Sequence, residues 1–403
     1  MCGITGFLDA RGHLDAGAAE ATLLRMERAM PHRGPDDEGI WCEPQAGVGF
    51  GHRRLSIVDL SPLGHQPMHS ASSRYTLAFN GEIYNYRELK DELLARGHAF
   101  RGGSDTEVIL AGCEAWGVER TLQRCVGMFA IALWDHQARE LHLARDRFGE
   151  KPLYYAQCGA LLLFGSELKT LRAHEGWRGS IDPDALALML ANSYVPAPWT
   201  IYREARKLMP GEWATVRARS GTLDIQLRRY WDPVTAVTEA MAAPLADPQA
   251  AVDAVEQALK TAVSRQMVAD VPVGAFLSGG VDSSLVVGVM QSLSRQPVRS
   301  FSIGFWEPDY NEAPFAKAVA GHLGTQHTEL MVTPADALGV IPDLPAIYDE
   351  PFADSSQIPT CLLSKLTRQS VTVSLSGDGG DELFGGYERY PAAERNWQRR
   401  QGA

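Results

Sequence analysis

The stretch VPVGAFLSGGVDSS, at residues 271–284, decides the fold of the second half of the chain. Its first part, Val271–Leu277, is an apolar run of strand length, and the apolar spacing that follows predicts a helix over Asp282–Leu293. Between them stand Gly279 and Gly280, which let backbone N–H groups approach a ligand closely. The pattern therefore predicts a strand, a glycine-rich turn and a helix in succession.

This turn has the donors that a phosphate group needs. The N-terminus of the following helix presents unpaired N–H groups and a positive potential, which favour anions. Further donors are the hydroxyls of Ser278, Ser283 and Ser284, and the carboxylate of Asp282 is suited to Mg²⁺. The lysine of a Walker P-loop is absent from the stretch. A capped helix after a turn is the plain alternative, but the residues resemble the pyrophosphate-binding loop of ATP pyrophosphatases.

A second loop, SGDGGDE at residues 376–382, follows the apolar strand predicted over Val371–Leu375. Ligands of parallel sheets bind at the carboxyl ends of the strands, so we expect both loops at the same edge. Three carboxylates beside a polyphosphate would repel it unless Mg²⁺ is present. Alone, the loop is equally typical of a solvated acidic turn, but together with the first loop it predicts metal and nucleotide binding.

The residues around these loops have the pattern of an α/β domain. Helices and apolar strands alternate after residue 249, which is typical of a parallel sheet covered on both faces. Besides the elements above, we predict a helix over Ala250–Met267, strands over Ser300–Phe305 and His327–Val332, and a helix that carries Phe315, Val319 and Leu323. The fold class predicted for residues 250–403 is an α/β parallel-sheet domain.

The first half differs, because strands follow strands with few helices between them. The predicted strands are Ile4–Asp9, Val48–Asp59, Tyr75–Asn80, Val126–Trp134, Glu140–Arg145 and Ala160–Gly165. Helices are predicted over Tyr86–Arg96 and from Ser104, which has capping-box spacing to Glu107. This order predicts a mostly antiparallel α+β domain over residues 1–233. Residues 234–249, rich in Ala and Pro, are predicted to be a linker.

Composition limits the classes of function. Hydrophobic residues make up 45% and charged residues 22% of the 403 residues, as in soluble globular proteins. The net charge of -11 disfavours nonspecific binding to nucleic acid, and no apolar run has the length that crosses a membrane. The six cysteines form no CxxC pair, and the sequence has neither an N-glycosylation sequon nor a signal peptide. These features predict a cytoplasmic protein.

Cys2 directly follows Met1. Removal of Met1 would leave a thiol and a free α-amino group on one residue. The thiolate is a good nucleophile, and an α-amino group, with a reference pKa of about 7.7 to 8.0, is suited to act as the base beside it. Taken alone, a Met-Cys start is more readily explained as an accident of sequence, so the hypothesis depends on the rest of the chain.

Eight motifs together resemble those of the glutamine-hydrolysing asparagine synthetases of bacteria. The resemblance runs from Cys2 to about Tyr387, and the order and separation of the motifs match the family. The motifs are MCGITG (1–6), HRGPD (32–36), HRRLSIVD (52–59), NGEIYN (80–85), GSD (103–105), RDRFG (145–149), LSGGVDSS (277–284) and LSGDGGDELFGGY (375–387).

For the first domain, the resemblance implies an N-terminal nucleophile hydrolase fold of αββα layers, which is a class II glutamine amidotransferase. Cys2 would attack the side-chain amide of glutamine, form a thioester and release ammonia. Asn80 and the backbone N–H of Gly81 would form the oxyanion hole. The substrate would be bound by Arg54 at its α-carboxylate and by Glu82 and Asp105 at its ammonium group, with Leu55 and Ile57 as further binding positions. Each residue alone also has a plain structural interpretation, such as a turn at Asn80-Gly81.

For the second domain, the resemblance implies activation of a carboxylate as an acyl-adenylate, which ammonia from the first site would reach through a tunnel. Mg²⁺ would be bound by Asp282 and Asp381, and Asp378 takes the place of an acidic residue that handles the adenylate. Residues 350–359 are expected either to border the pyrophosphate or acceptor pocket or to form a surface loop. The implied ATP contacts are Leu277, Ser278, Gly279, Gly280, Asp282, Ser283, Ser284, Ile303, Ser376 and Gly377.

The resemblance leaves several alternatives open. Family members continue beyond Gly385-Gly386-Tyr387, so we expect the second domain to be incomplete, with part of an apolar face uncovered. The main expectation is asparagine formation from aspartate, glutamine and ATP. The alternatives are another carboxylate acceptor, glutaminase activity alone, and a non-catalytic binding protein that keeps the fold. A homodimer is a candidate assembly.

Overall fold

The computed structural model describes residues 1–401 and divides the chain into two compact units. Unit 1 comprises Met1–Pro244 together with Asp343–Asp354, and unit 2 comprises Leu245–Pro342 and the chain from Ser355 onward. The first division falls within the segment expected to be a linker. The short second stretch of unit 1 was not expected from the sequence.

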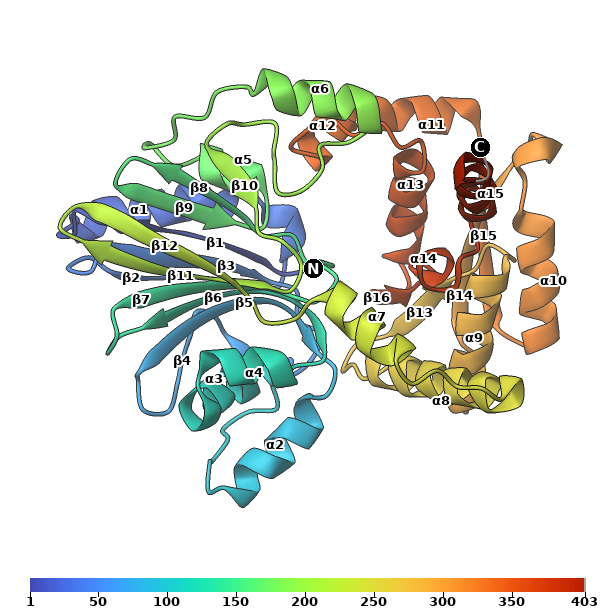
Figure 1. Ribbon diagram of the computed structural model, residues 1–403, viewed down its shortest axis with the longest axis horizontal. Coiled ribbons are helices and arrows are strands. Elements are labelled where there is room, and N and C mark those ends of the chain that lie inside the picture. Colours follow the sequence, from blue (N-terminus) through green and yellow to red (C-terminus); the bar gives the residue numbers. More distant parts are fainter. Residues whose placement is uncertain (402–403) are drawn as a thin grey trace. The chain divides into compact units, whose positions relative to one another are not determined.

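Unit 1 contains two antiparallel six-stranded sheets (Figure 1). Its strands are β1 (Gly3–Asp9), β2 (Asp37–Glu43), β3 (Val48–Arg54), β4 (Met68–His69), β5 (Tyr75–Ile83), β6 (Gly127–Asp135), β7 (Glu140–Arg145), β8 (Tyr154–Cys158), β9 (Leu161–Gly165), β10 (Ala205–Lys207), β11 (Glu212–Arg219) and β12 (Thr222–Arg229). The first sheet has the order β10-β8-β9-β1-β3-β2, and the second has the order β12-β11-β7-β6-β5-β4.

Helices cover the outer faces of both sheets. The helices of unit 1 are α1 (Ala16–Arg28), α2 (Tyr86–Ala95), α3 (Asp105–Trp116), α4 (Val118–Arg124), α5 (Leu168–Arg172), α6 (Pro183–Asn192), α7 (Pro233–Met241) and α12 (Leu344–Ile347). Helices α1 and α5 pack on the first sheet, and α2, α3 and α4 lie on the side of the second (Figure 1). The αββα layering expected from the resemblance is confirmed.

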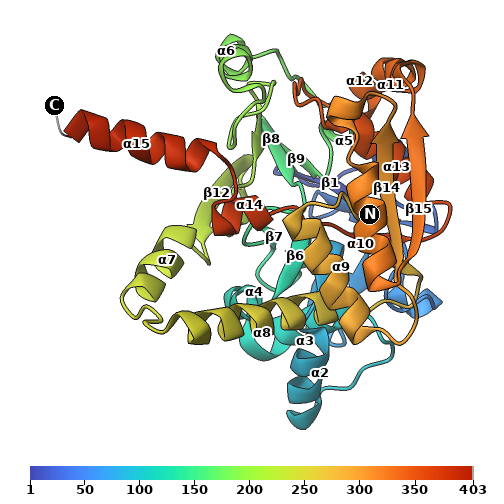
Figure 2. The same ribbon diagram turned by 90° about the vertical axis from the view of Figure 1, so that its right-hand side faces the viewer.

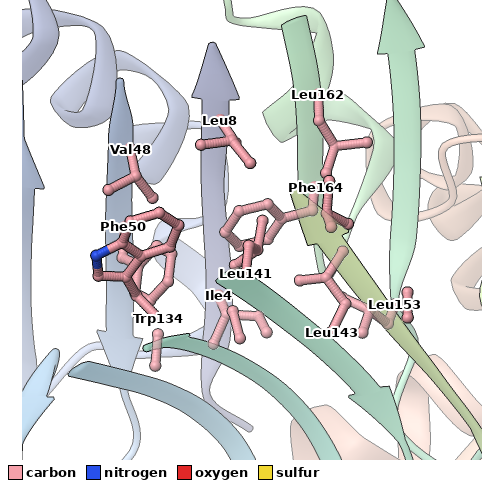
Figure 3. Packing of buried hydrophobic residues seen from close by; sticks show 14 of the residues in the cluster. Ile4, Leu8, Val48, Phe50, Trp134, Leu141, Leu143, Leu153, Leu162 and Phe164 are labelled. Carbon is pink, nitrogen blue, oxygen red and sulfur yellow. The ribbon is translucent and has the colours of Figure 1, made fainter. Parts of the chain in front are cut away.

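The main core of unit 1 lies between the two sheets. Every second residue of each central strand points into it, as the period of a β-strand requires. Ile4 and Leu8 of β1 and Phe50 of β3 thereby meet Trp134 of β6 and Leu141 of β7 (Figure 3). The intervening residues of the first sheet, such as Phe7 and Leu163, pack under α1 and α5 instead. Both faces of the first sheet are thus apolar, which is why its strands lack polar alternation.

Most predicted strands are observed with end shifts of one or two residues, but β3 ends earlier than predicted and β5 continues beyond Asn80 to Ile83. The strands that were not predicted are β2, β4, β8, β10, β11 and β12. The strand predicted over Val48–Asp59 ends at Arg54, since the chain then turns back and Asp59 has a φ of 58°. Residues 234–249 are largely helical, because they contain α7 and the start of α8 (Pro248–Gln266). Asp232 caps α7 by accepting a 2.8 Å hydrogen bond from the backbone of Thr235.

Unit 2 is built on a four-stranded parallel sheet with the order β15-β14-β13-β16. Its strands are β13 (Val273–Phe276), β14 (Arg299–Phe305), β15 (Gln326–Val332) and β16 (Val373–Leu375). Besides α8, its helices are α9 (Val281–Leu293), α10 (Ala313–Leu323), α11 (Pro334–Val340), α13 (Gln357–Thr367), α14 (Gly380–Phe384) and α15 (Arg389–Gln401). The predicted α/β parallel-sheet fold is confirmed.

The helices of unit 2 bury only part of their apolar residues. Val287 and Met290 of α9 and Ala316 of α10 pack with Leu277 in the core of the unit. In contrast, Val281 of α9 is 83% exposed, and Leu383 and Phe384 of α14 are also exposed. Helix α15 extends away from the sheet of its unit (Figure 2). Within residues 1–401, no helix combines the length and the apolar character needed to span a membrane.

Candidate functional site

The Cys2 thiol lies directly before β1 and against the loop that follows β3. Its Sγ is 3.5 Å from the carbonyl oxygen of Leu55 and 3.4 Å from the backbone nitrogen of the same residue. Burial raises the pKa of the thiol above its ordinary value, and the backbone N–H of Leu55 and the positive charge of Arg54 oppose this only in part. The thiol is therefore held mainly in its protonated form, and a nucleophilic role requires a base.

Two carboxyl groups, that of the buried Asp105 and that of the half-buried Glu82, lie near the thiol. Asp105, at the start of α3, accepts a 2.9 Å hydrogen bond from the backbone N–H of Ile83. Burial raises the pKa of Asp105 to about 6. Burial and the neighbouring Asp105 charge raise the pKa of Glu82 to about 7, although the nearby Lys151 ammonium acts against the rise. Such carboxyls would be ionised more readily beside a cationic ligand, as the ammonium group of an amino acid provides.

Asn80 and Gly81 lie near the end of β5, as the sequence placed them. The Asn80 side chain is 1% exposed, its Nδ2 donates to Ser166 Oγ at 3.4 Å, and its Oδ1 has no hydrogen-bond partner among the described residues. Rotating the amide by 180° would exchange this acceptor for a donor at the same place. A Cβ at Gly81 would lie 2.1 Å from the carbonyl oxygen of Met128, so only glycine fits between these strands. This pair therefore brings a buried, incompletely bonded amide next to a fixed backbone N–H.

Arg54 is buried and holds the loop that contains Leu55 and Ile57. Its guanidinium donates to the carbonyl oxygen of Ser61 at 3.1 Å and to that of Asp59. Both Leu55 and Ile57 are half-buried in this loop. Arg54 thus has a structural task besides the carboxylate binding expected from the resemblance, and its remaining N–H groups are the ones suited to a ligand.

The structure brings further charged residues to Cys2 that the sequence did not single out. Arg33 Nη1 donates to the carbonyl oxygen of Cys2 at 3.5 Å. The Nζ of Lys151 lies 3.1 Å from Sδ of Met1, and burial lowers the pKa of this lysine, which senses the charges of Glu82 and Cys2. Arg33 belongs to the HRGPD motif, and Lys151 closely follows the RDRFG motif. Both motifs were part of the family resemblance, but no role for their residues was predicted from the sequence.

The raised pKa of Glu82 has a consequence for stability. Because its pKa lies near 7 when folded and near 4.5 when unfolded, the folded unit binds more protons between these pH values. The stability contributed by the protonated form is complete below about pH 4.5 and is lost as the pH rises through about 7. We therefore expect Glu82→Gln to change the free energy of unfolding little at pH 4 and to increase it by about 3 kcal/mol at pH 8.

Denaturant unfolding of both proteins across this pH range measures the difference. Glu119→Gln is the matched control, since Glu119 lies exposed on α4, and its difference from the unchanged protein should not vary with pH. A Glu82→Gln difference that stays flat from pH 4 to pH 8 would contradict the assignment.

The second candidate site lies in unit 2, where the loops after β13 and β16 meet. These strands are adjacent and parallel. A Cβ at Gly380 would lie 2.4 Å from Oδ2 of Asp282, and one at Gly377 would lie 2.8 Å from the backbone nitrogen of Ser283. The two predicted loops therefore touch at the carboxyl edge of the sheet, and glycines permit the approach.

The first loop of unit 2 is closed by its own hydroxyl groups. Ser278 and Ser283 share a 2.9 Å hydrogen bond between their hydroxyls, and Ser278 Oγ also accepts from the backbone N–H of Gly280 at 3.2 Å. Ser284 Oγ is buried and has no hydrogen-bond partner among the described residues. Buried hydroxyls are normally paired, so this one is available to a ligand.

The other predicted site residues of unit 2 differ in how far they are exposed to solvent. Leu277 is buried in the core, so only its backbone is open to a ligand, whereas Ile303 of β14 is half-buried. The Asp378 carboxylate is exposed and accepts a 3.0 Å hydrogen bond from Ser376. Asp381, on the first turn of α14, has its carboxylate against Gly386. In the described chain, no three His, Cys, Asp or Glu side chains gather in a way that could hold a metal ion.

Comparison with known proteins identifies both parts of the chain. Residues 1–231 match the family model of the glutamine amidotransferase domain, and residues 254–402 match that of asparagine synthase. Glutamine-hydrolysing asparagine synthetase 1 of Bacillus subtilis (strain 168) is 36% identical over 394 residues, which are 97% of this chain and 59% of that protein.

Two further relatives have names that assign them provisionally to the asparagine synthetases. A Mycobacterium tuberculosis (strain H37Rv) protein named as a glutamine-hydrolysing asparagine synthetase is 40% identical over 97% of this chain and 61% of its own. A Methanocaldococcus jannaschii protein so named is 37% identical over 96% of this chain and 76% of its own. The chain thus spans about three fifths of the length of the first two relatives. The amidotransferase match over more than half of the chain and the extent of the archaeal match show that the chain belongs to the family of glutamine-hydrolysing asparagine synthetases.

Proposed function

We propose that unit 1 hydrolyses glutamine and that unit 2 uses ATP to activate the side-chain carboxylate of aspartate, so that the chain makes asparagine. The environment of Cys2 is the observation that supports the proposal. The thiol of the half-buried Cys2 lies 3.4 Å from a backbone nitrogen and close enough to Arg54 and Asp105 for their charges to affect its pKa, in a unit of amidotransferase fold. The names of the relatives, which are those of glutamine-hydrolysing asparagine synthetases, support asparagine as the product.

In unit 1, Cys2 Sγ attacks the side-chain amide carbon of glutamine. Its proton passes to the α-amino group that removal of Met1 would free, because burial makes the thiol too weak an acid without a base. The carbon–nitrogen bond breaks, the nitrogen takes that proton and leaves as ammonia, and the resulting thioester is hydrolysed by water to glutamate. Asn80 and the N–H of Gly81 stabilise the oxyanion, a contribution typically of about 3 to 4 kcal/mol. Arg54 binds the α-carboxylate, and Glu82 and Asp105 bind the α-ammonium group.

In unit 2, a carboxylate oxygen of aspartate attacks the α-phosphorus of ATP, and the bond to the bridging oxygen breaks to release pyrophosphate. The loop of Ser278–Ser284, with its unpaired Ser284 hydroxyl, binds the pyrophosphate group. Ammonia then attacks the acyl carbon and AMP leaves. Asp378 lies in the acidic loop beside this reaction and contacts the adenylate.

Asp282 and Asp381 would hold Mg²⁺ at this site. Two carboxylates completed by substrate phosphates are an ordinary ligand set for this ion. When bound, Mg²⁺ neutralises charge on the polyphosphate. Asp282 lies on the first turn of α9, where the helix N-terminus faces the same ligand.

Incubation of the purified chain with glutamine, ATP, Mg²⁺ and aspartate tests the proposal. We expect glutamate, AMP, pyrophosphate and asparagine in equal amounts. Glutamate without AMP would favour glutaminase activity alone, and AMP with a different amide product would identify another carboxylate acceptor. No release of glutamate at all would contradict the proposal for unit 1.

Asp282→Asn is expected to lower ATP–pyrophosphate exchange by roughly 10- to 100-fold, because it removes one of the two charges that would bind the metal. Glutamine hydrolysis, which depends on unit 1, should remain. Asp253→Asn is the control, since Asp253 is exposed on α8, and it should leave both reactions unchanged. Undiminished exchange in Asp282→Asn would remove this residue from the metal site.

We further propose that the protein works in the cytoplasm as a homodimer. All six cysteines are free of disulfides, which supports a reducing compartment. Sedimentation equilibrium of the purified chain tests the dimer.

A further inference from the structure

Residues 343–354 belong to unit 1 although they lie within the sequence matched by the asparagine synthase model. The chain leaves unit 2 after Pro342 and returns to it at Ser355. This segment therefore brings side chains from the second half of the sequence into the amidotransferase unit. Its short helix is α12 (Figure 1).

Two carboxylates at adjacent positions, those of Asp349 and Glu350, bind the segment to the rest of unit 1. Asp349 accepts a 3.0 Å hydrogen bond from the backbone N–H of Lys169, and its other oxygen lies 3.2 Å from Nζ of the same lysine. Glu350 accepts a 3.1 Å hydrogen bond from the backbone N–H of Ile201 and forms an ion pair with Lys207. The Asp349 side chain is 8% exposed, so its contacts are largely shielded from water.

From Asp349, a chain of alternating charges leads to the nucleophile. Lys169 also pairs with Glu167, and Glu167 pairs with Arg33. Arg33 in turn donates to the carbonyl oxygen of Cys2 at 3.5 Å. Although burial alone would raise the pKa of Glu167, hydrogen bonds and charges from His32, Arg33 and Lys169 lower it to about 2.

This chain has no net charge, and its members depend on one another. The side chains of Arg33 and Glu167 are 11% and 10% exposed. Breaking a buried ion pair by removing one partner leaves the other without compensation, so the remaining groups must shift to find new partners. Loss of the Asp349 charge would leave Lys169 with Glu167 as its remaining carboxylate partner among the described residues, and the lysine would draw Glu167 away from Arg33. Arg33 would then hold Cys2 less firmly.

We propose that Asp349, Lys169 and Glu167 are positioning residues for Cys2, so that residues 343–354 complete the glutamine site of unit 1. The inference rests on the proposed glutaminase function. Asp349 touches neither glutamine nor the thiol and acts only through Lys169, Glu167 and Arg33. Because the segment is joined at both ends to unit 2, the nucleophile is positioned by a part of the chain whose ends belong to the other unit.

Steady-state glutamine hydrolysis by full-length Asp349→Asn, Lys169→Met and the double variant tests the proposal. For each single variant we expect kcat to fall about tenfold with KM changed less than twofold, because the geometry of the nucleophile is altered but substrate binding is not. The double variant should lose no more than either single variant, since all act through one chain. Asp349→Glu, which restores the charge, should recover most of kcat.

Asp343→Asn is the matched control, since Asp343 begins the same segment and is exposed, and its kcat should be unchanged. Thermal unfolding identifies any variant that fails to fold, and Asp349→Asn, with nearly the same shape as aspartate, then decides the case. An unchanged kcat in folded Asp349→Asn, or additive losses in the double variant, would overturn the inference. Absence of hydrolysis in the unchanged protein would instead refute the proposed function.

Discussion

Replacing Cys2 by alanine is expected to reduce glutamine hydrolysis by roughly 10³-fold or more. Alanine has no atom that can bond to the amide carbon, so the thioester cannot form. The surroundings, including Arg54, Asn80 and Asp105, would remain and would still bind glutamine. Glutamate release by the purified protein measures the effect, and glutamine binding by calorimetry should be retained. Because the reaction proposed for unit 2 takes only ammonia from unit 1, asparagine formation from added ammonium, aspartate and ATP should also be retained.

Cys158→Ala is the matched control for this experiment. Cys158 is another half-buried, free cysteine of unit 1, at the end of β8. Its replacement should leave glutamine hydrolysis unchanged. If Cys2→Ala kept a tenth or more of the activity, another group would have to be the nucleophile.

Trp134→Ala is expected to lower the free energy of unfolding of unit 1 by about 3 to 5 kcal/mol. The Trp134 side chain is 1% exposed in the core between the two sheets (Figure 3). Its Nε1 donates a 3.1 Å hydrogen bond to Glu43. The substitution leaves a large cavity, because neighbouring strands are hydrogen-bonded on both sides and collapse only slightly. Urea unfolding, monitored by the hydrogen exchange of the β6 amides, measures the stability of this unit alone.

Trp397→Ala provides the comparison, because Trp397 is 62% exposed on α15. The same chemical change there should alter the free energy of unfolding by less than about 0.5 kcal/mol. A Trp134→Ala protein that unfolds at the same urea concentration as the unchanged protein would show that the two sheets are not held by this core.

Elements with strong local patterns could be predicted from the sequence. Strand β7 has the predicted bounds, and α9 begins one residue before its predicted start. The loop at residues 278–284 and the helix cap at Ser104 are also where the pattern placed them. At Ser104 the box is half formed, because Glu107 accepts from the backbone of Arg101 and Gly102 instead of closing it.

Elements with weak patterns were not predicted. Strand β12 has charged or polar residues at most positions and is stabilised by pairing with β11, which the sequence does not reveal. Strand β10 has only three residues, too few for a period to be detected. Helix α7 depends on a proline and a capping aspartate that are equally typical of a turn.

For the candidate sites, the motifs predicted which residues carry the chemistry, because a thiol, a glycine-rich turn or an acidic loop requires particular residue types close together in sequence. They did not identify what surrounds those residues. Glu167 lies 165 positions from Cys2, and Asp349 lies 180 positions from Lys169. Contacts over such separations depend on how sheets and loops pack, and no local period encodes them. The same holds for the pKa of Glu82, which is set by burial that exists only in the folded unit.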